Sequence, residues 1–122
     1  MNTEVENIIK REIIKKTLLS DDVFGELEKK KKELFKIIPE LKKEDGFDQK
    51  NDWHIYDVWN HTKYAVSKSD KDLKIRLALL LHDIGKPCSY QEENGVRHFK
   101  GHSEKSAQIS MNVLKRLRIS SG

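Results

Sequence analysis

The sequence has too little cysteine and too few long apolar runs for several classes of protein. Its single cysteine, Cys88, excludes an internal disulfide and a cysteine-rich metal site. No apolar run approaches the roughly 20 residues that cross a bilayer, and the N-terminus MNTEVENIIKREIIKK lacks the profile of a signal peptide. We therefore expect a soluble cytoplasmic protein with no membrane partner.

Several catalytic motifs are also missing. No serine or cysteine stands in a triad-like context, and no glycine-rich loop is present that could cradle phosphates. Hydrolytic chemistry on this chain would therefore need a nucleophile other than a side chain.

The length of 122 residues suits one small domain, residues 1–122, and the net charge of +4 is mild. This charge permits a phosphate or RNA partner, although solubility explains it equally well. The lysine run EKKKKE (28–33) has the same two readings, a nucleic-acid patch or a solvated helix face.

Helical patterns cover most of the chain, and several of their starts carry capping residues. The expected helices begin near Thr3, Ser20, Ile55, Ser69 and Ser103. Pro39 should end the second helix or restart it, and residues 42–53 should form a polar connector. Asn94-Gly95 indicates a two-residue hairpin turn before the last helix. The pattern predicts an all-helical domain with a small β-hairpin.

All five histidines lie between residues 54 and 102. His54, Asp57 and His61 stand at i, i+3 and i+7, so a helix would place them on one face. A lone histidine in such a place is more often an interfacial residue that is hydrogen-bonded to its neighbours.

The pair His82-Asp83 ends the apolar run LALLL. Adjacent side chains on a helix diverge by about 100°, so we expect the two groups to converge on a third object rather than on each other. A buried carboxylate needs a partner, and a divalent cation bound by imidazole and carboxylate supplies one. A structural ion-pair network is the alternative.

Further ligands must come from other segments. His61 is the best third ligand, because its helix precedes the central one and could pack against it. His98 and His102 could bind a second metal or meet a substrate phosphate. Lys86 could contact a phosphate, or be an ordinary exposed lysine near a helix C-terminus.

A cation held by these residues would lower the pKa of a bound water and neutralise charge on a phosphoryl oxygen. Two metals about 3.5–4 Å apart would bracket both the attacking and the leaving oxygen. This chemistry requires no side-chain nucleophile.

The pattern His61…His82-Asp83, followed by Ile84-Gly85-Lys86, resembles the HD superfamily of metal-dependent phosphohydrolases in its HDIG variant. The similarity extends to the HD region of CCA-adding tRNA nucleotidyltransferases and related poly(A) polymerases. It rests on motifs that occur in this order: LLSDD, IIPEL, WHIYDVWNHT, LALLLHDIGKP, HFKGHSEKSA and VLKRLRIS.

The resemblance implies an all-α, HD-domain-like helical bundle, with N-terminal helices at 1–41 and the HD core at 54–119. It implies metal ligation by His61, His82 and Asp83, with residues placed like His98 and His102 completing a second metal. The implied cofactor is one or two divalent ions of manganese, magnesium, nickel, cobalt, iron or zinc. The implied activity is phosphomonoesterase or phosphodiesterase. We predict Asp83 and Lys86 as the catalytic residues.

Two departures from the family pattern matter. The nucleotidyltransferase head is absent, so nucleotide addition to tRNA is not expected from this chain alone. The family's downstream metal-ligating aspartate is absent too, because no aspartate follows Asp83. We expect a C-terminally shortened member, or a ligand from water or a neighbouring subunit of a homodimer.

Two functions therefore stay open. The first is a metal-dependent phosphohydrolase that acts on a nucleotide or another small phosphoester. The second is a non-catalytic HD-like module that binds RNA, nucleotide or a protein partner.

Overall fold

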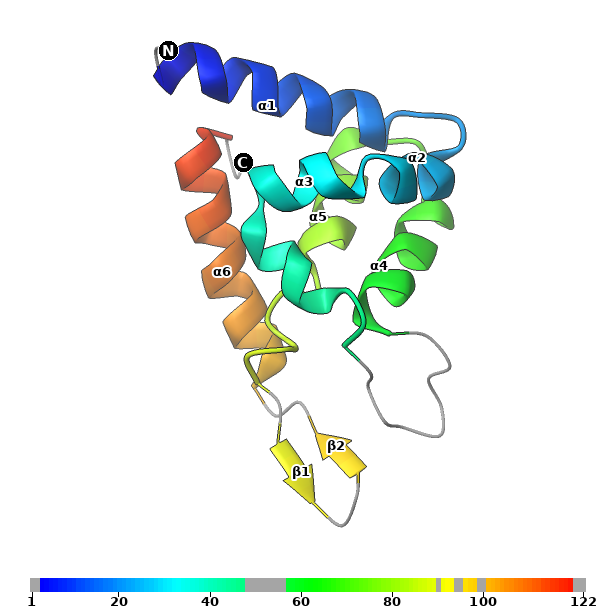
Figure 1. Ribbon diagram of the computed structural model, residues 1–122, viewed down its shortest axis with the longest axis vertical. Coiled ribbons are helices and arrows are strands. Elements are labelled where there is room, and N and C mark those ends of the chain that lie inside the picture. Colours follow the sequence, from blue (N-terminus) through cyan, green and yellow to red (C-terminus); the bar gives the residue numbers. More distant parts are fainter. Residues whose placement is uncertain (1–2, 48–56, 90, 94–95, 99–100, 120–122) are drawn as a thin grey trace.

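The computed structural model describes residues 3–47, 57–89, 91–93, 96–98 and 101–119, and most of these residues are helical (Figure 1). The helices are α1 (Thr3–Leu18), α2 (Val23–Lys29), α3 (Lys31–Ile37), the 3₁₀ helix η1 (Pro39–Glu44), α4 (Val58–Ser67), α5 (Leu73–Leu81) and α6 (His102–Leu117). The predicted all-helical class is confirmed.

Two short strands lie between α5 and α6 in the chain. The strands β1 (Gln91–Glu93) and β2 (Val96–His98) pair antiparallel, with Glu93 opposite Val96. The turn predicted at residues 94–95 lies outside the described residues.

The helices surround one apolar core. α5 lies between α4 and α6, α1 crosses one end, and α2, α3 and η1 cover the near side in Figure 1. Buried apolar side chains from every helix meet in this core: Ile14, Leu18, Val23, Leu27, Leu34, Ile37, Ile38, Leu41, Trp59, Val66, Leu80, Leu81, Ile84, Val113 and Leu117. The described helices include none with the length and apolar character to cross a bilayer.

The second predicted helix is broken into two, and this part of the prediction is wrong. α2 ends at Lys29 and α3 begins at Lys31, with Lys30 at φ −93° and ψ 9° between them. The break lets both halves use the core, since Leu27 and Leu34 are 0% and 1% exposed. Pro39 then starts η1, as proline suits the first turn of a helix.

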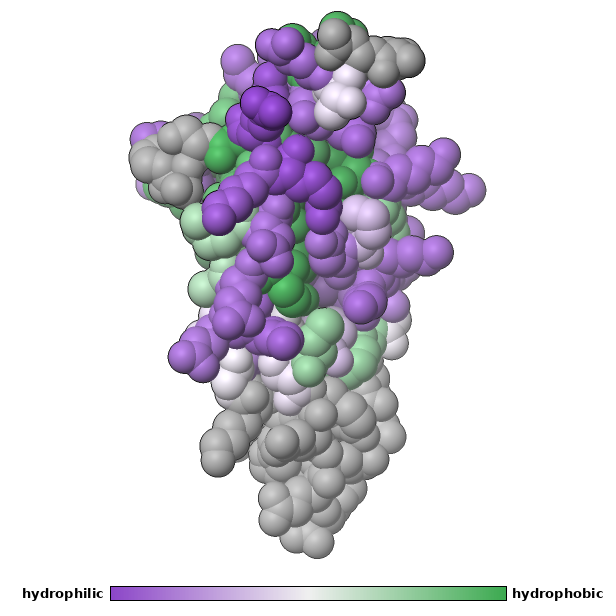
Figure 2. Space-filling model, turned by 90° about the vertical axis from the view of Figure 1, so that its left-hand side faces the viewer, coloured by the Kyte–Doolittle hydropathy of each residue, from purple (hydrophilic) through white to green (hydrophobic). Residues whose placement is uncertain are grey.

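The outer face of α6 is largely hydrophilic, with apolar side chains visible between the charged ones (Figure 2). Its hidden face carries Val113 and Leu117 into the core. The end of α6 is tied to α1, because Arg11 Nη1 donates a hydrogen bond of 2.8 Å to the Leu117 carbonyl oxygen.

Removal of a core side chain from α5 should destabilise the whole domain. Leu80 is 0% exposed, and we expect Leu80→Ala to lower the free energy of unfolding by about 2–5 kcal/mol through lost burial and a cavity. Urea denaturation at constant pH measures the change. Ile75→Ala is the matched control on the same helix, because Ile75 is 43% exposed, and it should cost less than about 1 kcal/mol. Equal losses in the two variants would contradict this core.

Candidate metal centre

The start of α4 positions His61. Asp57 caps this helix, because its Oδ1 accepts a hydrogen bond of 2.7 Å from the Asn60 backbone N–H. Its Oδ2 accepts a second bond, 2.6 Å, from the backbone N–H of Gly46. The expected helical face His54–Asp57–His61 is therefore wrong for Asp57, which precedes the helix. His54 lies outside the described residues.

The end of α5 positions the His82-Asp83 pair. The helix ends at Leu81, His82 is its C-cap, and Asp83 begins the turns that follow. Ile84, in the first of these turns, is buried in the core. The buried Arg76 secures α5 by donating a hydrogen bond of 2.7 Å to the Leu18 carbonyl oxygen at the end of α1.

Gly85 lets the turn after α5 lie directly against α6. Its backbone N–H donates a hydrogen bond of 2.8 Å to the Ser106 hydroxyl. A Cβ atom at this position would stand 2.4 Å from the Ser106 backbone nitrogen, so only glycine fits without displacing α6. This contact brings the first turn of α6, with His102, close to Asp83.

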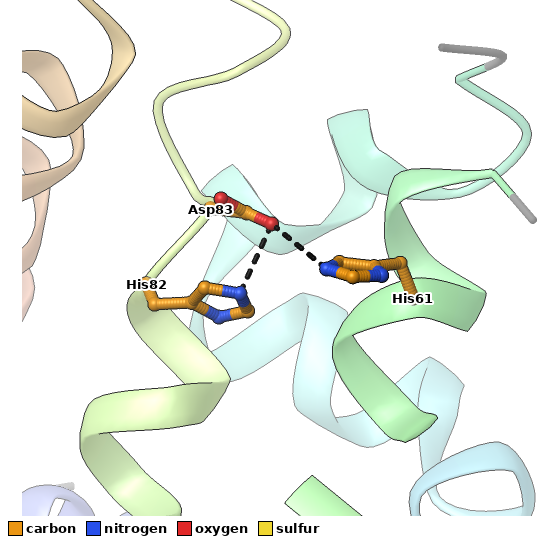
Figure 3. A group of neighbouring side chains, drawn as sticks. All are labelled: His61, His82 and Asp83. Atoms are coloured by element: carbon orange, nitrogen blue, oxygen red, sulfur yellow. Dashed lines mark ion pairs between the residues drawn. The ribbon is translucent and has the colours of Figure 1, made fainter. Parts of the chain in front are cut away.

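His61, His82 and Asp83 meet between α4 and the end of α5 (Figure 3). Asp83 Oδ2 lies 3.0 Å from His82 Nε2 and 3.6 Å from His61 Nε2. The three donor atoms all lie within 4.8 Å of one another, and Asp83 is buried. Three side chains from two elements thus surround one small volume.

The expected divergence of His82 and Asp83 is wrong. His82 Nε2 and Asp83 Oδ2 lie 3.0 Å apart at the end of α5, although His82 keeps helical dihedral angles (φ −63°, ψ −31°), so the side chains themselves bridge the angle between neighbouring positions. The pair therefore makes direct contact and also faces His61.

The tautomer of His82 suits a ligand. Its Nδ1 contacts the Leu79 carbonyl oxygen, which can only accept a hydrogen bond, so the Nδ1 atom carries the proton. The lone pair of Nε2 then faces Asp83 Oδ2. Two lone pairs at 3.0 Å need a positive charge between them, either a second proton or a bound cation.

Two more basic groups reach Asp83. Lys86 Nζ lies 3.5 Å from Oδ2, and Lys86 is only 8% exposed, so it is not an ordinary surface lysine. His102 Nδ1 lies 3.8 Å from Oδ1 and has no hydrogen-bond partner among the described residues. His98 belongs to β2, but its side chain lies outside the described part of the structure.

The pKa values follow from this crowding. Burial alone would raise the pKa of Asp83, but the hydrogen bond and charge of His82, with the charges of Lys86 and His61, lower it to about 2. Burial alone would lower the pKa of His82, yet its interactions with Asp83 raise it. Asp83 is therefore ionised at neutral pH.

Residues 51–121 match the family model of the HD domain. This chain belongs to the HD domain family. HD domains bind divalent metals and are typically metal-dependent phosphohydrolase folds. We call the cluster of His61, His82 and Asp83 the HD site.

The relatives that align with this chain include tRNA nucleotidyltransferases. It is 35% identical over 89 residues to the A-adding tRNA nucleotidyltransferase of Deinococcus radiodurans, covering 67% of this chain and 20% of that protein. It is 36% identical over 88 residues to the CC-adding tRNA nucleotidyltransferase of Thermus thermophilus, covering 66% and 20%. It is 31% identical over 87 residues to the multifunctional CCA protein of Shewanella denitrificans, covering 68% of this chain and 21% of that protein.

The chain thus spans about a fifth of the length of these relatives. No solved structure matches it at a comparable level of similarity.

A cavity of about 460 Å³ adjoins the HD site between α5 and α6. Its wall includes His82, the apolar Leu77 and Leu114, and the hydroxyls of Ser103 and Ser110. The cavity thus offers both apolar surface and hydroxyl groups to an organic group bound there.

Glu44 is a buried carboxyl group, close enough to Asp83 to feel its charge, that the sequence did not reveal. It ends η1, is 0% exposed, and its Oε1 accepts a hydrogen bond of 2.8 Å from Thr62 Oγ1. Burial raises its pKa to about 8, and the charges of Asp83 and Asp57 add to the effect. No sequence signal marked it, because it lies in the charged stretch KKED.

The buried Glu44 should make stability fall with rising pH. Its pKa is about 8 in the folded state against 4.5 for an unperturbed glutamate side chain, so between these values the folded state holds the extra proton. We expect the Tm of the metal-free protein to fall by roughly 5–10 °C from about pH 5 to about pH 8. Glu44→Gln should flatten this decline, as thermal melts followed by circular dichroism in the presence of a chelator would measure.

Glu40→Gln is the control for that experiment. Glu40 also lies in η1 but pairs with Arg116, whose hydrogen bond lowers its pKa. Its variant should keep the wild-type slope. Parallel slopes for wild type and Glu44→Gln would show that Glu44 titrates normally.

Proposed function

We propose that this chain is a metal-dependent phosphohydrolase that holds a divalent cation through His61, His82 and Asp83. One observation carries this proposal: the Nε2 atoms of His82 and His61 lie 3.0 and 3.6 Å from Oδ2 of the buried Asp83. An ion pair alone would account for one such contact, whereas three converging donors of these types are a typical ligand set for a transition metal.

The spacing fits one ion. Ligand bonds of about 2.1 Å place neighbouring donor atoms about 3–4 Å apart, and the distances of 3.0 and 3.6 Å from Asp83 Oδ2 to the two imidazoles lie in that interval. The ligand types favour zinc, manganese, iron, cobalt or nickel, with magnesium less suited to imidazole.

A bound cation would supply an activated water and would neutralise charge on a phosphoryl oxygen. The chain's own groups have distinct tasks. Asp83 holds the negative charge of the site, and Lys86, beside it, can pair with a substrate phosphate. His102 is our candidate for a second ion, because Nδ1 faces Asp83 Oδ1. His98 stays a prediction for that same role.

The substrate class follows from the cavity and the relatives. A phosphoester placed with its phosphate at the HD site could extend its organic part into the cavity beside His82. A nucleotide fits this description, and the curated relatives are named as tRNA nucleotidyltransferases. We therefore favour a nucleotide or another small phosphoester.

The experiment is metal analysis followed by a hydrolysis assay. Protein purified without chelator should contain about one transition metal per chain and hydrolyse an aryl phosphate or a 2′,3′-cyclic nucleotide in the presence of Mn²⁺. Asp83→Asn and His82→Ala should lose bound metal, and their kcat/KM should fall by at least about a hundredfold.

Asp70→Asn is the matched control, because Asp70 is an exposed aspartate outside the site. It should keep both metal and activity. Undiminished turnover in His82→Ala and Asp83→Asn would refute the assigned site.

The second candidate is a non-catalytic module that binds RNA. Exposed basic residues on and just after α6 favour it: Lys105, Lys115, Arg116 and Arg118. Under this function the metal analysis would succeed while no phosphoester turned over. A tRNA transcript would then bind, with an affinity that falls steeply as salt is added.

A further inference from the structure

Glu44 combines complete burial with an incomplete set of hydrogen bonds. Its side chain is 0% exposed, and Oε1 is satisfied by the Thr62 hydroxyl at 2.8 Å. Its other oxygen, Oε2, has no hydrogen-bond partner among the described residues. A buried carboxylate in this state would be costly, so the group needs either a proton or a nearby positive charge.

The location of Glu44 links it to the HD site. Its hydrogen-bond partner Thr62 follows His61 on α4. The charges of Asp83 and Lys86 both act on Glu44. The carboxyl group thus approaches the site from η1, a third element beside α4 and the end of α5.

Charge balance shows what a cation would change. Without an ion, Lys86 and the second proton of His82 face the single negative charge of Asp83, and the buried Glu44 is neutral. A divalent cation takes the place of the His82 proton and adds one further positive charge, while Asp83 stays the only described carboxylate in the ligand cluster. A second buried negative charge nearby then becomes favourable.

We propose that Glu44 is the proton-holding carboxyl of the HD site: it keeps a proton while the site is free and releases it when a divalent cation binds. The proton passes to solvent, and the carboxylate that remains offsets the charge of the ion. Glu44 acts through the site's electrostatics and is a positioning residue. This inference rests on the proposed metal centre.

Several groups act on the titration of Glu44. Asp83 and Asp57 favour its protonated form, as does burial, which is the largest effect. The Thr62 hydroxyl and the charge of Lys86 favour the ionised form. The pKa of about 8 that results leaves the carboxyl mainly protonated at neutral pH.

The test counts protons released on metal binding. Metal-free protein is titrated anaerobically with Mn²⁺ in a calorimeter, in pairs of buffers that differ in ionisation enthalpy, at about pH 7 and about pH 9. The dependence of the binding heat on the buffer yields the number of protons released per ion. At about pH 7 the wild type should release up to about one proton more than Glu44→Gln.

This difference should vanish near pH 9, where Glu44 is already ionised. The wild-type affinity for Mn²⁺ should therefore rise about tenfold more than that of Glu44→Gln between the two pH values. Glu40→Gln, on the same helix, should behave as the wild type. Thr62→Val keeps the carboxyl but removes the bond that favours ionisation, so it should still release the extra proton near pH 9.

The outcomes separate the two proposals. If wild type and Glu44→Gln bind Mn²⁺ with equal proton release at both pH values, the role of Glu44 is refuted while the metal centre stands. If Glu44→Gln folds but binds no Mn²⁺, Thr62→Val decides the role of Glu44. Extra proton release from Thr62→Val near pH 9 would support that role, and no extra release would refute it. If folded wild type binds no Mn²⁺, the metal centre fails and this inference fails with it.

Discussion

The buried carboxylate of Asp83 is the constraint around which this site is organised. An ionised group away from water must be offset by positive charge or by hydrogen bonds. The chain surrounds Asp83 with His61, His82, Lys86 and His102, each within 4 Å. A cation could replace the proton between His82 and Asp83, and the side chains that already face Asp83 would then be its ligands.

The fold keeps these groups in place through contacts away from the charged atoms. Asp57 fixes the first turn of α4, and Arg76 secures α5 to the end of α1. Gly85 allows the turn after α5 to approach Ser106, so His102 at the start of α6 lies beside Asp83. The apolar core behind them is continuous from α1 to α6. A ligand set drawn from separate elements therefore depends on the packing of the whole domain.

Membership of the HD domain family and the geometry of the cluster support the same chemistry from independent directions. Asp83 is the only carboxylate of the described ligand cluster, so a divalent ion there would call for further negative charge. Glu44 offers a carboxyl from the opposite part of the chain, upstream of His61, and its burial explains why it would carry a proton until an ion arrives. In this proposal the released proton leaves a carboxylate that offsets part of the charge of the ion.

The sequence alone determined the helical class and the family, because helical periodicity and the HD motif are local patterns. It also singled out His61, His82 and Asp83, which the structure brings close together. It did not determine the break at Lys30, the cap at Asp57, or the direct contact between His82 and Asp83, since each depends on where a helix ends. Nothing in the sequence distinguished Glu44 from the charged residues beside it. Only tertiary packing buries it against Thr62, because burial is a property of the neighbours that the folded chain brings together and not of the residue itself.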